Sequence, residues 1–191
     1  INDFANAVRR GISPENENYF PVFPYTSYRL ISDTDLVDLW EFWQTLPAIE
    51  TASRRHEIEF PSVFRAVIKG WKVSNFNADW VKRKTNRRGR YLVEVLGHCA
   101  ECHTPRLFFG GLDQGQWLKG GPNPSGKGKI PGITSAILDW SEEEIIEYLS
   151  TGFTPEFDVA GGGMARVIEN TSRLEIQDLK AIASYLKALK D

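Results

Sequence analysis

Cys99-Ala100-Glu101-Cys102-His103 is the most informative segment of this sequence. Two thiols three positions apart can form thioether bonds with the two vinyl groups of a haem, and the histidine that follows then lies beneath the iron as its axial ligand. The chain contains 2 cysteines, so the motif uses every thiol in it. We therefore predict one covalently bound haem. The same count excludes a disulfide framework and a four-cysteine iron–sulfur or zinc site.

Other kinds of Cys-x-x-Cys site differ in their surroundings. A thioredoxin-type redox pair follows a strand and begins a helix, whereas Arg90–Gly97 predicts an amphipathic helix that runs directly into the motif. A Cys2His2 zinc site needs a second histidine beyond the pair, and the remaining histidines, His56 and His98, both precede it. His98, directly before the first cysteine, cannot turn toward the iron. These comparisons favour haem attachment.

The single methionine, Met164, follows three glycines, Gly161–Gly163. Glycines let the backbone approach a flat ligand closely. A methionine that fills a gap in the core is the alternative interpretation. As the second axial ligand, Met164 would complete a His/Met iron, which raises the reduction potential and closes the site to other ligands. Such a site transfers electrons rather than binding a substrate.

Composition and charge fit a carrier of this kind. The formal net charge of -2 gives no general attraction to nucleic acid. No run of eighteen apolar residues occurs, so we expect no transmembrane segment in this chain. The chain begins at Ile1, without methionine or a signal peptide, which indicates a processed protein or a fragment. Because haem c is attached outside the cytoplasm in bacteria, we expect a periplasmic location or the outer face of the inner membrane.

The second half predicts an all-α fold. Ser141 and Glu144 form a capping-box pattern that begins a helix over 141–151, and Gly152 ends it. Apolar residues at helical spacing predict a final helix over 175–190. The segment 104–139 is rich in glycine and proline and is expected to be irregular. A haem would fill the volume that three helices around such a loop leave open.

Residues 88–191 resemble a class I cytochrome c domain, in particular the c-type cytochrome subunits of periplasmic alcohol, gluconate and aldehyde dehydrogenases. The matching segments are Arg90-Tyr-Leu-Val, Gly97-His-Cys-Ala-Glu-Cys-His-Thr-Pro-Arg106, Trp140-Ser-Glu-Glu-Glu-Ile, Gly152-Phe-Thr-Pro and Gly162-Gly-Met164 with Asn170-Thr-Ser. The resemblance implies that the carbonyl of Pro131 accepts a hydrogen bond from the other ring nitrogen of His103. Gly132 stands where the family usually has a polar residue.

Three further residues are candidates for contact with the haem. Trp140 and Tyr148 could line its edge, near a propionate or the methionine sulfur, or they could be ordinary aromatic core. Arg106 could neutralise a propionate, or it could be a solvated surface charge. The predicted cofactor-binding set is Cys99, Cys102, His103, Met164, Pro131, Arg106, Trp140 and Tyr148, with His103 and Met164 as the iron ligands.

The first half repeats the second imperfectly. Residues 3–15 align without a gap with 144–156, and 35–46 align with 178–189 after a slip of two residues. Phe23 occupies the position that corresponds to Met164, twelve residues after the matched glycine. We interpret residues 1–50 as a partial cytochrome c-like segment without a haem-attachment motif. This predicts helices over 3–14 and 33–46, with Phe23 directed into apolar contacts.

Residues 51–87 are interpreted as a connector rather than a domain. The connector runs into a basic stretch, Lys82–Arg90, that carries six positive residues in nine. A solvated linker is the simpler interpretation of this stretch. A docking patch for an acidic partner protein is the alternative.

The sequence as a whole predicts an electron-transfer cytochrome rather than an enzyme. A dehydrogenase subunit or the quinol pool would supply electrons, and another cytochrome or an oxidase would accept them. One alternative is a haem enzyme of the peroxidase or thiosulfate-oxidising type, which needs an open position on the iron. Another is an assembly subunit that tethers a larger complex through its first half.

Overall fold

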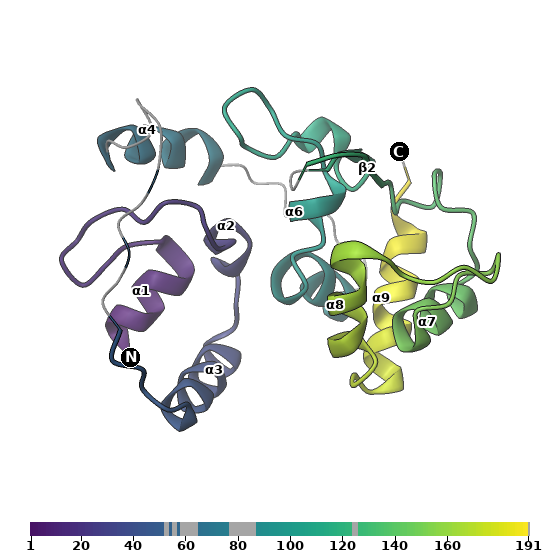
Figure 1. Ribbon diagram of the computed structural model, residues 1–191, viewed down its shortest axis with the longest axis horizontal. Coiled ribbons are helices and arrows are strands. Elements are labelled where there is room, and N and C mark those ends of the chain that lie inside the picture. The colour runs from purple at the N-terminus through teal and green to yellow at the C-terminus, as the bar shows by residue number, and fades with distance from the viewer. Residues whose placement is uncertain (52–53, 55–56, 58–64, 77–86, 124–125, 191) are drawn as a thin grey trace. The chain divides into compact units, whose positions relative to one another are not determined.

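The structure is a computed structural model that describes residues 1–51, 54, 57, 65–76, 87–123 and 126–190. The chain divides into two compact units, Ile1–Asp79 and Trp80–Asp191. Both are mostly helical, and a small sheet of two strands lies in the second unit (Figure 1). None of the helices in the described ranges combines the length and the apolar composition that a membrane span requires.

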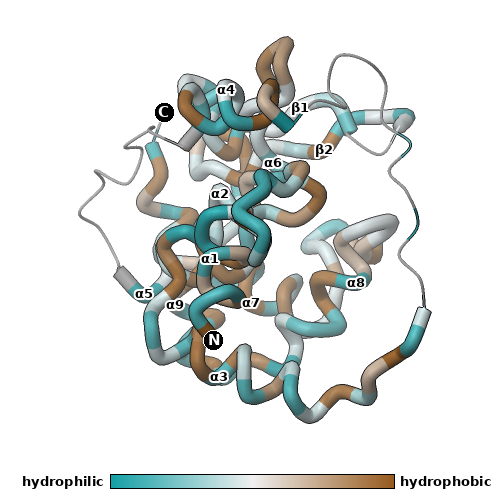
Figure 2. The backbone as a smooth tube through the Cα atoms, turned by 90° about the vertical axis from the view of Figure 1, so that its left-hand side faces the viewer, coloured by the Kyte–Doolittle hydropathy of each residue, from teal (hydrophilic) through white to brown (hydrophobic). Residues whose placement is uncertain are grey.

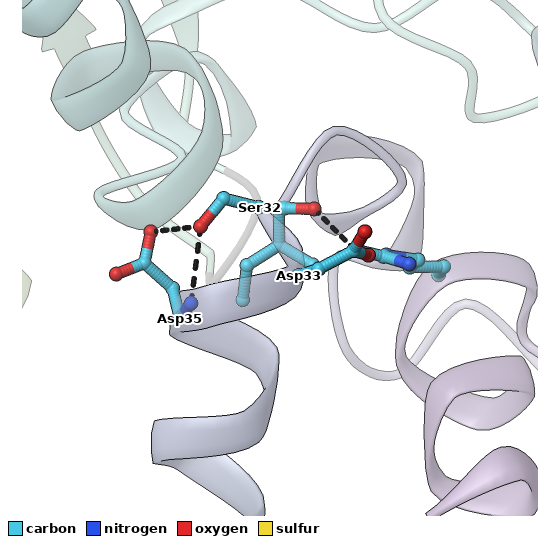
Figure 3. A network of polar contacts seen from close by, with 5 residues as sticks. Ser32, Asp33 and Asp35 are labelled. Atoms are coloured by element: carbon cyan, nitrogen blue, oxygen red, sulfur yellow. Dashed lines mark hydrogen bonds and ion pairs between the residues drawn. The ribbon is translucent and has the colours of Figure 1, made fainter.

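The first unit contains four described helices. They are α1 (Asn2–Arg10), α2 (Tyr25–Tyr28), α3 (Asp33–Thr45) and α4 (Arg65–Phe76). The hydroxyl of Ser32 caps the start of α3 by accepting a hydrogen bond from the backbone N–H of Asp35 at 3.0 Å (Figure 3). Arg9 of α1 forms an ion pair with Asp33 at 2.6 Å, which joins the two helices.

Helix α4 lies within the segment interpreted above as a connector. The ammonium of Lys72 donates hydrogen bonds to the carbonyls of Arg10 and Gly11 and to Oδ1 of Asn18. Arg65 donates to the carbonyl of Asn18 at 2.5 Å. Both contacts attach α4 to the loop that follows α1. Burial lowers the pKa of Lys72 to about 8, and the nearby charge of Arg10 adds to the effect.

The second unit begins with a helical segment that leads into the cysteine motif. Its elements in chain order are α5 (Arg87–Arg90), the π-helix η2 (Tyr91–Leu96), α6 (Ala100–His103), the 3-10 turn η3 (Gln114–Gln116), β1 (Gly120–Pro122), β2 (Lys129–Pro131), α7 (Glu142–Thr151), α8 (Gly162–Thr171) and α9 (Ile176–Ala188). β1 and β2 pair antiparallel, with Gly121 opposite Ile130. The predicted irregular segment 104–139 therefore contains a short hairpin, and α8 is a helix that the sequence analysis did not predict.

The core of the second unit lies where α5, η2 and α7 pack against α9. Gly89 allows the closest approach, because a Cβ atom at this position would lie 1.9 Å from the carbonyl oxygen of Ala181. Ser141 begins α7 with the predicted capping box: its hydroxyl accepts from the N–H of Glu144 at 3.1 Å, and its own N–H donates to the Glu144 carboxylate at 2.7 Å. The contact of α5 and η2 with α9 positions the segment that leads into the cysteines.

The turns after α1 and α7 have the same backbone structure. Gly11 and Gly152 end the two helices in the left-handed conformation, with φ of 58° and 85°. An isolated β-bridge follows each glycine, Ile12–Asn18 in the first unit and Phe153–Val159 in the second. Each residue of the first turn is thus matched by the residue 141 positions later, without a gap.

The match between the two units extends to side chains and to helices α3 and α9. The hydroxyls of Ser13 and Thr154 both accept a hydrogen bond from the N–H four residues later, at 3.2 and 3.1 Å. Helices α3 and α9 each contain 13 residues and correspond after a shift of 143 positions. Helix α3, at Asp33–Thr45, matches the predicted 33–46 to within one residue. The helix predicted over 3–14 ends four residues early, at Arg10, because Gly11 adopts the left-handed conformation and the chain turns there. The aromatic ring of Phe23 is half-buried and contacts the rings of Tyr19 and Tyr25.

Candidate haem site

The cysteine motif forms a single helical turn at the end of a longer helical segment. The N–H of Cys99 donates to the carbonyl of Val93 at 3.0 Å, which continues the segment from η2 into α6. The N–H of His103 donates to the carbonyl of Cys99 at 2.9 Å. Residues three and four apart share one face of a helix. Cys99, Cys102 and His103 are therefore presented on the same side of α6.

The imidazole of His103 is buried and held in one orientation. Its side chain is 7% exposed, and Nδ1 lies 2.8 Å from the carbonyl oxygen of Pro131 in β2. Burial lowers the pKa of His103 below its usual value, although the contact with Pro131 opposes this. A carbonyl can only accept a hydrogen bond, so Nδ1 carries the proton and Nε2 keeps its lone pair. A neutral imidazole of this tautomer can bind a metal ion through Nε2.

The backbone at Gly132, directly after Pro131, lies close to neighbouring parts of the second unit. A Cβ atom at this position would lie 2.8 Å from the backbone of Lys119 and 2.7 Å from Cδ1 of Ile137. The side chain of another residue would push β2 away from its neighbours. This explains why glycine occupies the position at which the sequence departs from the usual family pattern.

Cys99, the first cysteine of the motif, lacks the environment of an attacking redox thiol. Both cysteines are free, Cys99 partly buried and Cys102 exposed. Burial raises the pKa of Cys99 to about 12, whereas an attacking thiol of a redox pair has a lowered pKa. The motif follows helical turns, whereas a thioredoxin-type site follows a strand. The geometry therefore disfavours a dithiol redox centre.

A zinc site has no support among the described residues. In that part of the chain, no group of three or more His, Cys, Asp or Glu side chains could hold a metal ion. His56, one of the two other histidines, lies outside the described residues. His98 directly precedes Cys99 and has a positive φ of 37°.

Met164 lies in the first turn of α8 and is half-buried. Gly161 precedes the helix as its N-cap residue and provides no side-chain cap. A Cβ atom at Gly161, Gly162 or Gly163 would meet nothing within 4 Å. The space next to Met164 is therefore free for a flat group to approach the backbone.

A buried hydroxyl that sequence reasoning missed belongs to Thr134, three residues after Pro131 in the chain. Thr134 is 3% exposed, and within the described residues its Oγ1 has no hydrogen-bond partner. Buried polar groups in proteins nearly always have a partner. A polar group of a bound ligand would supply one here. Threonine is too common in loops for the sequence to indicate this position.

The remaining predicted residues contact protein groups. Arg106 forms an ion pair with Glu101 at 2.7 Å and donates to the carbonyl of Gly110 at 2.9 Å. The rings of Trp140 and Tyr148 meet edge to face, with centroids 5.1 Å apart, and Trp140 packs against the core. Burial raises the pKa of Tyr148. Contact of these three residues with a haem remains a prediction.

The donors present fit a covalently attached haem. Two thiols and a neutral imidazole share one face of α6, the imidazole has an orienting acceptor, and Thr134 offers an unpaired hydroxyl. Each of these observations depends on a different residue. Together they fit a covalently bound haem better than they fit a dithiol redox centre or a zinc site.

Comparison with known proteins points in the same direction. No family model matches the chain. It is 50% identical over 191 residues to a diheme cytochrome c-type protein of Cereibacter sphaeroides, covering 98% of this chain and 64% of that one. It is 32% identical over 207 residues to the fructose dehydrogenase cytochrome subunit of Gluconobacter japonicus, covering 99% of this chain and 41% of that one. It is 31% identical over 210 residues to the gluconate 2-dehydrogenase cytochrome c subunit of Pantoea cypripedii, covering 98% and 46%. The chain thus spans less than two thirds of these relatives.

Proposed function

Because this chain belongs to the cytochrome c family, together with cytochrome subunits of dehydrogenases, we propose that it is an electron-transfer protein rather than a catalytic subunit. In this proposal Cys99 and Cys102 bind one haem through thioether bonds, and His103 and Met164 are the axial ligands of its iron. His103 directly follows Cys102, the second cysteine of the motif. The observation that carries the proposal is the contact of 2.8 Å between its Nδ1 and the carbonyl oxygen of Pro131. It leaves Nε2 free to bind iron.

The chain's own residues hold and orient the group. When bound, a haem supplies a reversible one-electron couple at its iron. Pro131 fixes the ring of His103 and increases its basicity through the Nδ1 proton. Thr134 would donate its buried hydroxyl to a propionate. Met164, following glycines that leave space beside it, would approach from α8 and exclude other ligands.

One haem is the count that this chain's thiols allow. Both cysteines belong to the same motif, and a second pair of thioether bonds has no thiol. The diheme relative is longer, since the match covers 64% of it. A second haem, where one exists, would therefore need cysteines beyond these 191 residues.

The relatives' names suggest the electron donor. Two relatives are named as cytochrome subunits of a fructose dehydrogenase and of a gluconate 2-dehydrogenase. In our proposal a dehydrogenase subunit or the quinol pool supplies the electrons, and another cytochrome or an oxidase accepts them. Haem c attachment occurs outside the bacterial cytoplasm, which favours the periplasm or the outer face of the inner membrane.

The first 50 residues are proposed to be a partial cytochrome c-like segment. The matched turns after α1 and α7 and the equal lengths of α3 and α9 support this interpretation. Phe23 would occupy the position of Met164, and its ring cannot bind iron. Segment 51–87 would then be the connection to the haem domain, 88–191. The basic run Lys82–Arg90 lies mostly outside the described residues; its described members Arg88 and Arg90 form ion pairs with Asp178 and Glu94.

The proposed function can be tested on the purified native protein. A pyridine haemochrome assay combined with intact mass should give one haem per 191-residue chain, and acid acetone should not extract it. The reduced protein should not bind carbon monoxide at neutral pH, because both axial positions are filled. Extractable haem would contradict the thioether bonds, and carbon monoxide binding would favour a haem enzyme with an open iron.

A further inference from the structure

An apolar patch is exposed on the turn that joins α7 to α8 (Figure 1). Phe157 is 93% exposed, and Phe153 and Val159, which pair in the β-bridge, are 55% and 60% exposed. Hydrogen bonds hold the turn: the N–H of Phe157 donates to the carbonyl of Thr154 at 3.0 Å, and the N–H of Asp158 donates to the Thr154 hydroxyl at 3.1 Å. Grouped and exposed apolar side chains are typical of a surface that binds a partner. We call Phe153, Phe157 and Val159 the turn patch.

Folding of the turn does not account for Phe157. The same turn in the first unit carries Asn16 at the matching position, with φ of 61° against 63° for Phe157. Asparagine tolerates this left-handed conformation, whereas a bulky residue is strained in it. The exposed ring of Phe157 also buries almost no surface. The aromatic side chain therefore has a cost within this chain, and contact with another molecule would offset it.

The matching turn of the first unit binds cations from helix α4. This helix carries both hydrophobic and hydrophilic residues (Figure 2), and two of its cations contact the turn. Arg65 forms an ion pair with Glu17 at 3.1 Å and donates to the carbonyl of Asn18 at 2.5 Å. Lys72 donates to the carbonyl of Gly11 at 2.6 Å. A turn with this backbone thus presents oxygen atoms that lysine and arginine can bind.

The corresponding oxygen atoms of the second unit have no such partner. Asp158 stands at the position of Glu17. The carbonyl of Val159 corresponds to that of Asn18. Among the described residues, no lysine or arginine donates a hydrogen bond to either group. Residues 130–165 contain seven acidic residues and no lysine or arginine. Charge of this sign attracts a cationic surface and repels an anionic lipid surface.

We propose that the turn patch binds an electron-carrier protein whose redox centre is surrounded by lysine or arginine side chains. This inference rests on the proposed electron-transfer function and specifies the partner. The basic rim of the partner would meet Glu156 and Asp158, and its apolar centre would cover Phe157. Val159 lies five residues before Met164, so the partner would dock beside the segment that supplies the proposed axial ligand.

An NMR titration of the isotope-labelled, haem-loaded protein tests the proposal. The probe is a lysine-rich cytochrome c of the mitochondrial type, whose lysines surround its exposed haem edge. At low ionic strength the probe should shift the amide signals of residues 153–159. The affinity should fall at least about threefold between about 20 mM and about 200 mM salt, because ions screen the attraction.

Phe157→Asn tests the apolar part of the surface. It introduces the residue type that the matching turn carries at Asn16, so the fold should persist, and thermal unfolding checks this. The dissociation constant should rise at least about tenfold, since buried aromatic residues dominate many interfaces. Phe108→Asn is the matched control, because it removes a ring that is 95% exposed from another turn of the same unit. Its dissociation constant should stay within about twofold of the parent's.

Glu156→Gln tests the charged part of the surface. Removal of this exposed carboxylate should weaken binding at least about twofold at low salt, and the difference should disappear at high salt. Glu15→Gln makes the same change of charge at the matching exposed position of the first unit. It should leave the affinity unchanged.

Three outcomes would overturn the proposal. One is the absence of shifts in the turn at low salt, or an unchanged dissociation constant for Phe157→Asn. Shifts of the same signals that increase with the protein's own concentration would identify a second copy as the occupant. Flotation with phosphatidylglycerol vesicles that Phe157→Asn abolishes would identify a lipid surface.

A pyridine haemochrome assay of the same sample keeps this proposal apart from the proposed function. One haem per chain without binding of the probe contradicts only the docking surface. A sample without covalent haem contradicts the proposed function instead.

Discussion

The hydroxyl of Tyr185 donates a hydrogen bond to Oε1 of Glu94 inside the second unit, joining α9 to the turns that lead into the cysteine motif. Glu94 is 2% exposed, and Nε of Arg90 donates to its other oxygen at 3.0 Å. A buried carboxylate needs hydrogen-bond partners of this kind, because it has lost its contacts with water. The pair therefore couples the position of η2, and with it Cys99, to the last helix.

Replacing Tyr185 with phenylalanine should destabilise the haem-loaded protein by about 1–3 kcal/mol, because Glu94 loses a donor and cannot recover water. Chemical denaturation followed by circular dichroism measures the change. Glu94→Gln is the companion variant: its amide oxygen still accepts from Tyr185 but lacks the charge that pairs with Arg90. If Tyr185→Phe is as stable as the parent protein, Glu94 is satisfied by other groups and the coupling is wrong.

Gly89→Ala should be severely destabilising. The added methyl group would lie 1.9 Å from the carbonyl oxygen of Ala181, so α5 and α9 would have to separate. We expect a loss of at least about 2 kcal/mol, with reduced yield of haem-loaded protein. Gly70→Ala in α4 is the matched control, since its Cβ would meet nothing within 4 Å. It should be neutral or stabilise by up to about 1 kcal/mol. Equal effects of the two variants would contradict the close approach.

Asp178 predicts a pH dependence of stability. A hydrogen bond from Arg88, aided by its charge, holds the pKa of Asp178 below its usual value, and burial opposes this. As the pH falls, the Asp178 carboxylate therefore becomes protonated at a higher pH in the unfolded chain than in the folded chain. The stabilisation is full above the unfolded pKa of about 3.9 and disappears as the pH falls through the lower folded value.

Asp178→Asn measures this effect. The variant should be less stable than the parent at neutral pH by up to about 1 kcal/mol, because the pair is partly exposed. The difference should shrink once the pH drops below about 3.9. Glu169→Gln, which removes an exposed carboxylate from α8, controls for the change in net charge. A difference that stays constant down to pH 2 would show that the ion pair is not its source.

Local signals in the sequence predicted the helices of the second unit well. The capping box at Ser141 and the left-handed Gly152 enclose α7 within a residue of the predicted 141–151, and α9 lies inside the predicted 175–190. Such signals act within one turn of helix, so they can be recognised without knowledge of the rest of the fold. Much of the haem motif's geometry has the same local origin, since Cys99 and His103 lie in one turn.

The features that the sequence did not reveal depend on distant contacts. Helix α8 begins with glycines and has no side-chain cap, and it is held partly by Thr171, which donates to the carbonyl of Leu149 at 2.7 Å. The amphipathic helix predicted over Arg90–Gly97 would leave the charged residue Glu94 on its polar face. The π-helical turn, in which the N–H of Gly97 donates to the carbonyl of Leu92, shifts the helical register of this segment, and Glu94 is buried. Leu149 as the partner of Thr171, and Tyr185 as the partner of Glu94, are both far away in the sequence and cannot be inferred from neighbouring residues.

Met164→Ala should leave the haem attached but vacate one axial position. Cys99, Cys102 and His103 are unchanged, so haemochrome stoichiometry should remain one per chain. Loss of the thioether should lower the reduction potential and allow the reduced protein to bind carbon monoxide. The far-red sulfur-to-iron charge-transfer band should disappear.

Val167→Ala is the matched control for this variant, because it shortens an exposed apolar side chain of α8 three residues away. It should keep the band and the potential of the parent protein. Titration with carbon monoxide and a spectroelectrochemical measurement on both variants separate loss of the ligand from a general change in α8. If Met164→Ala keeps the band and remains closed to carbon monoxide, another residue binds the iron, and the free space beside the three glycines serves a different purpose.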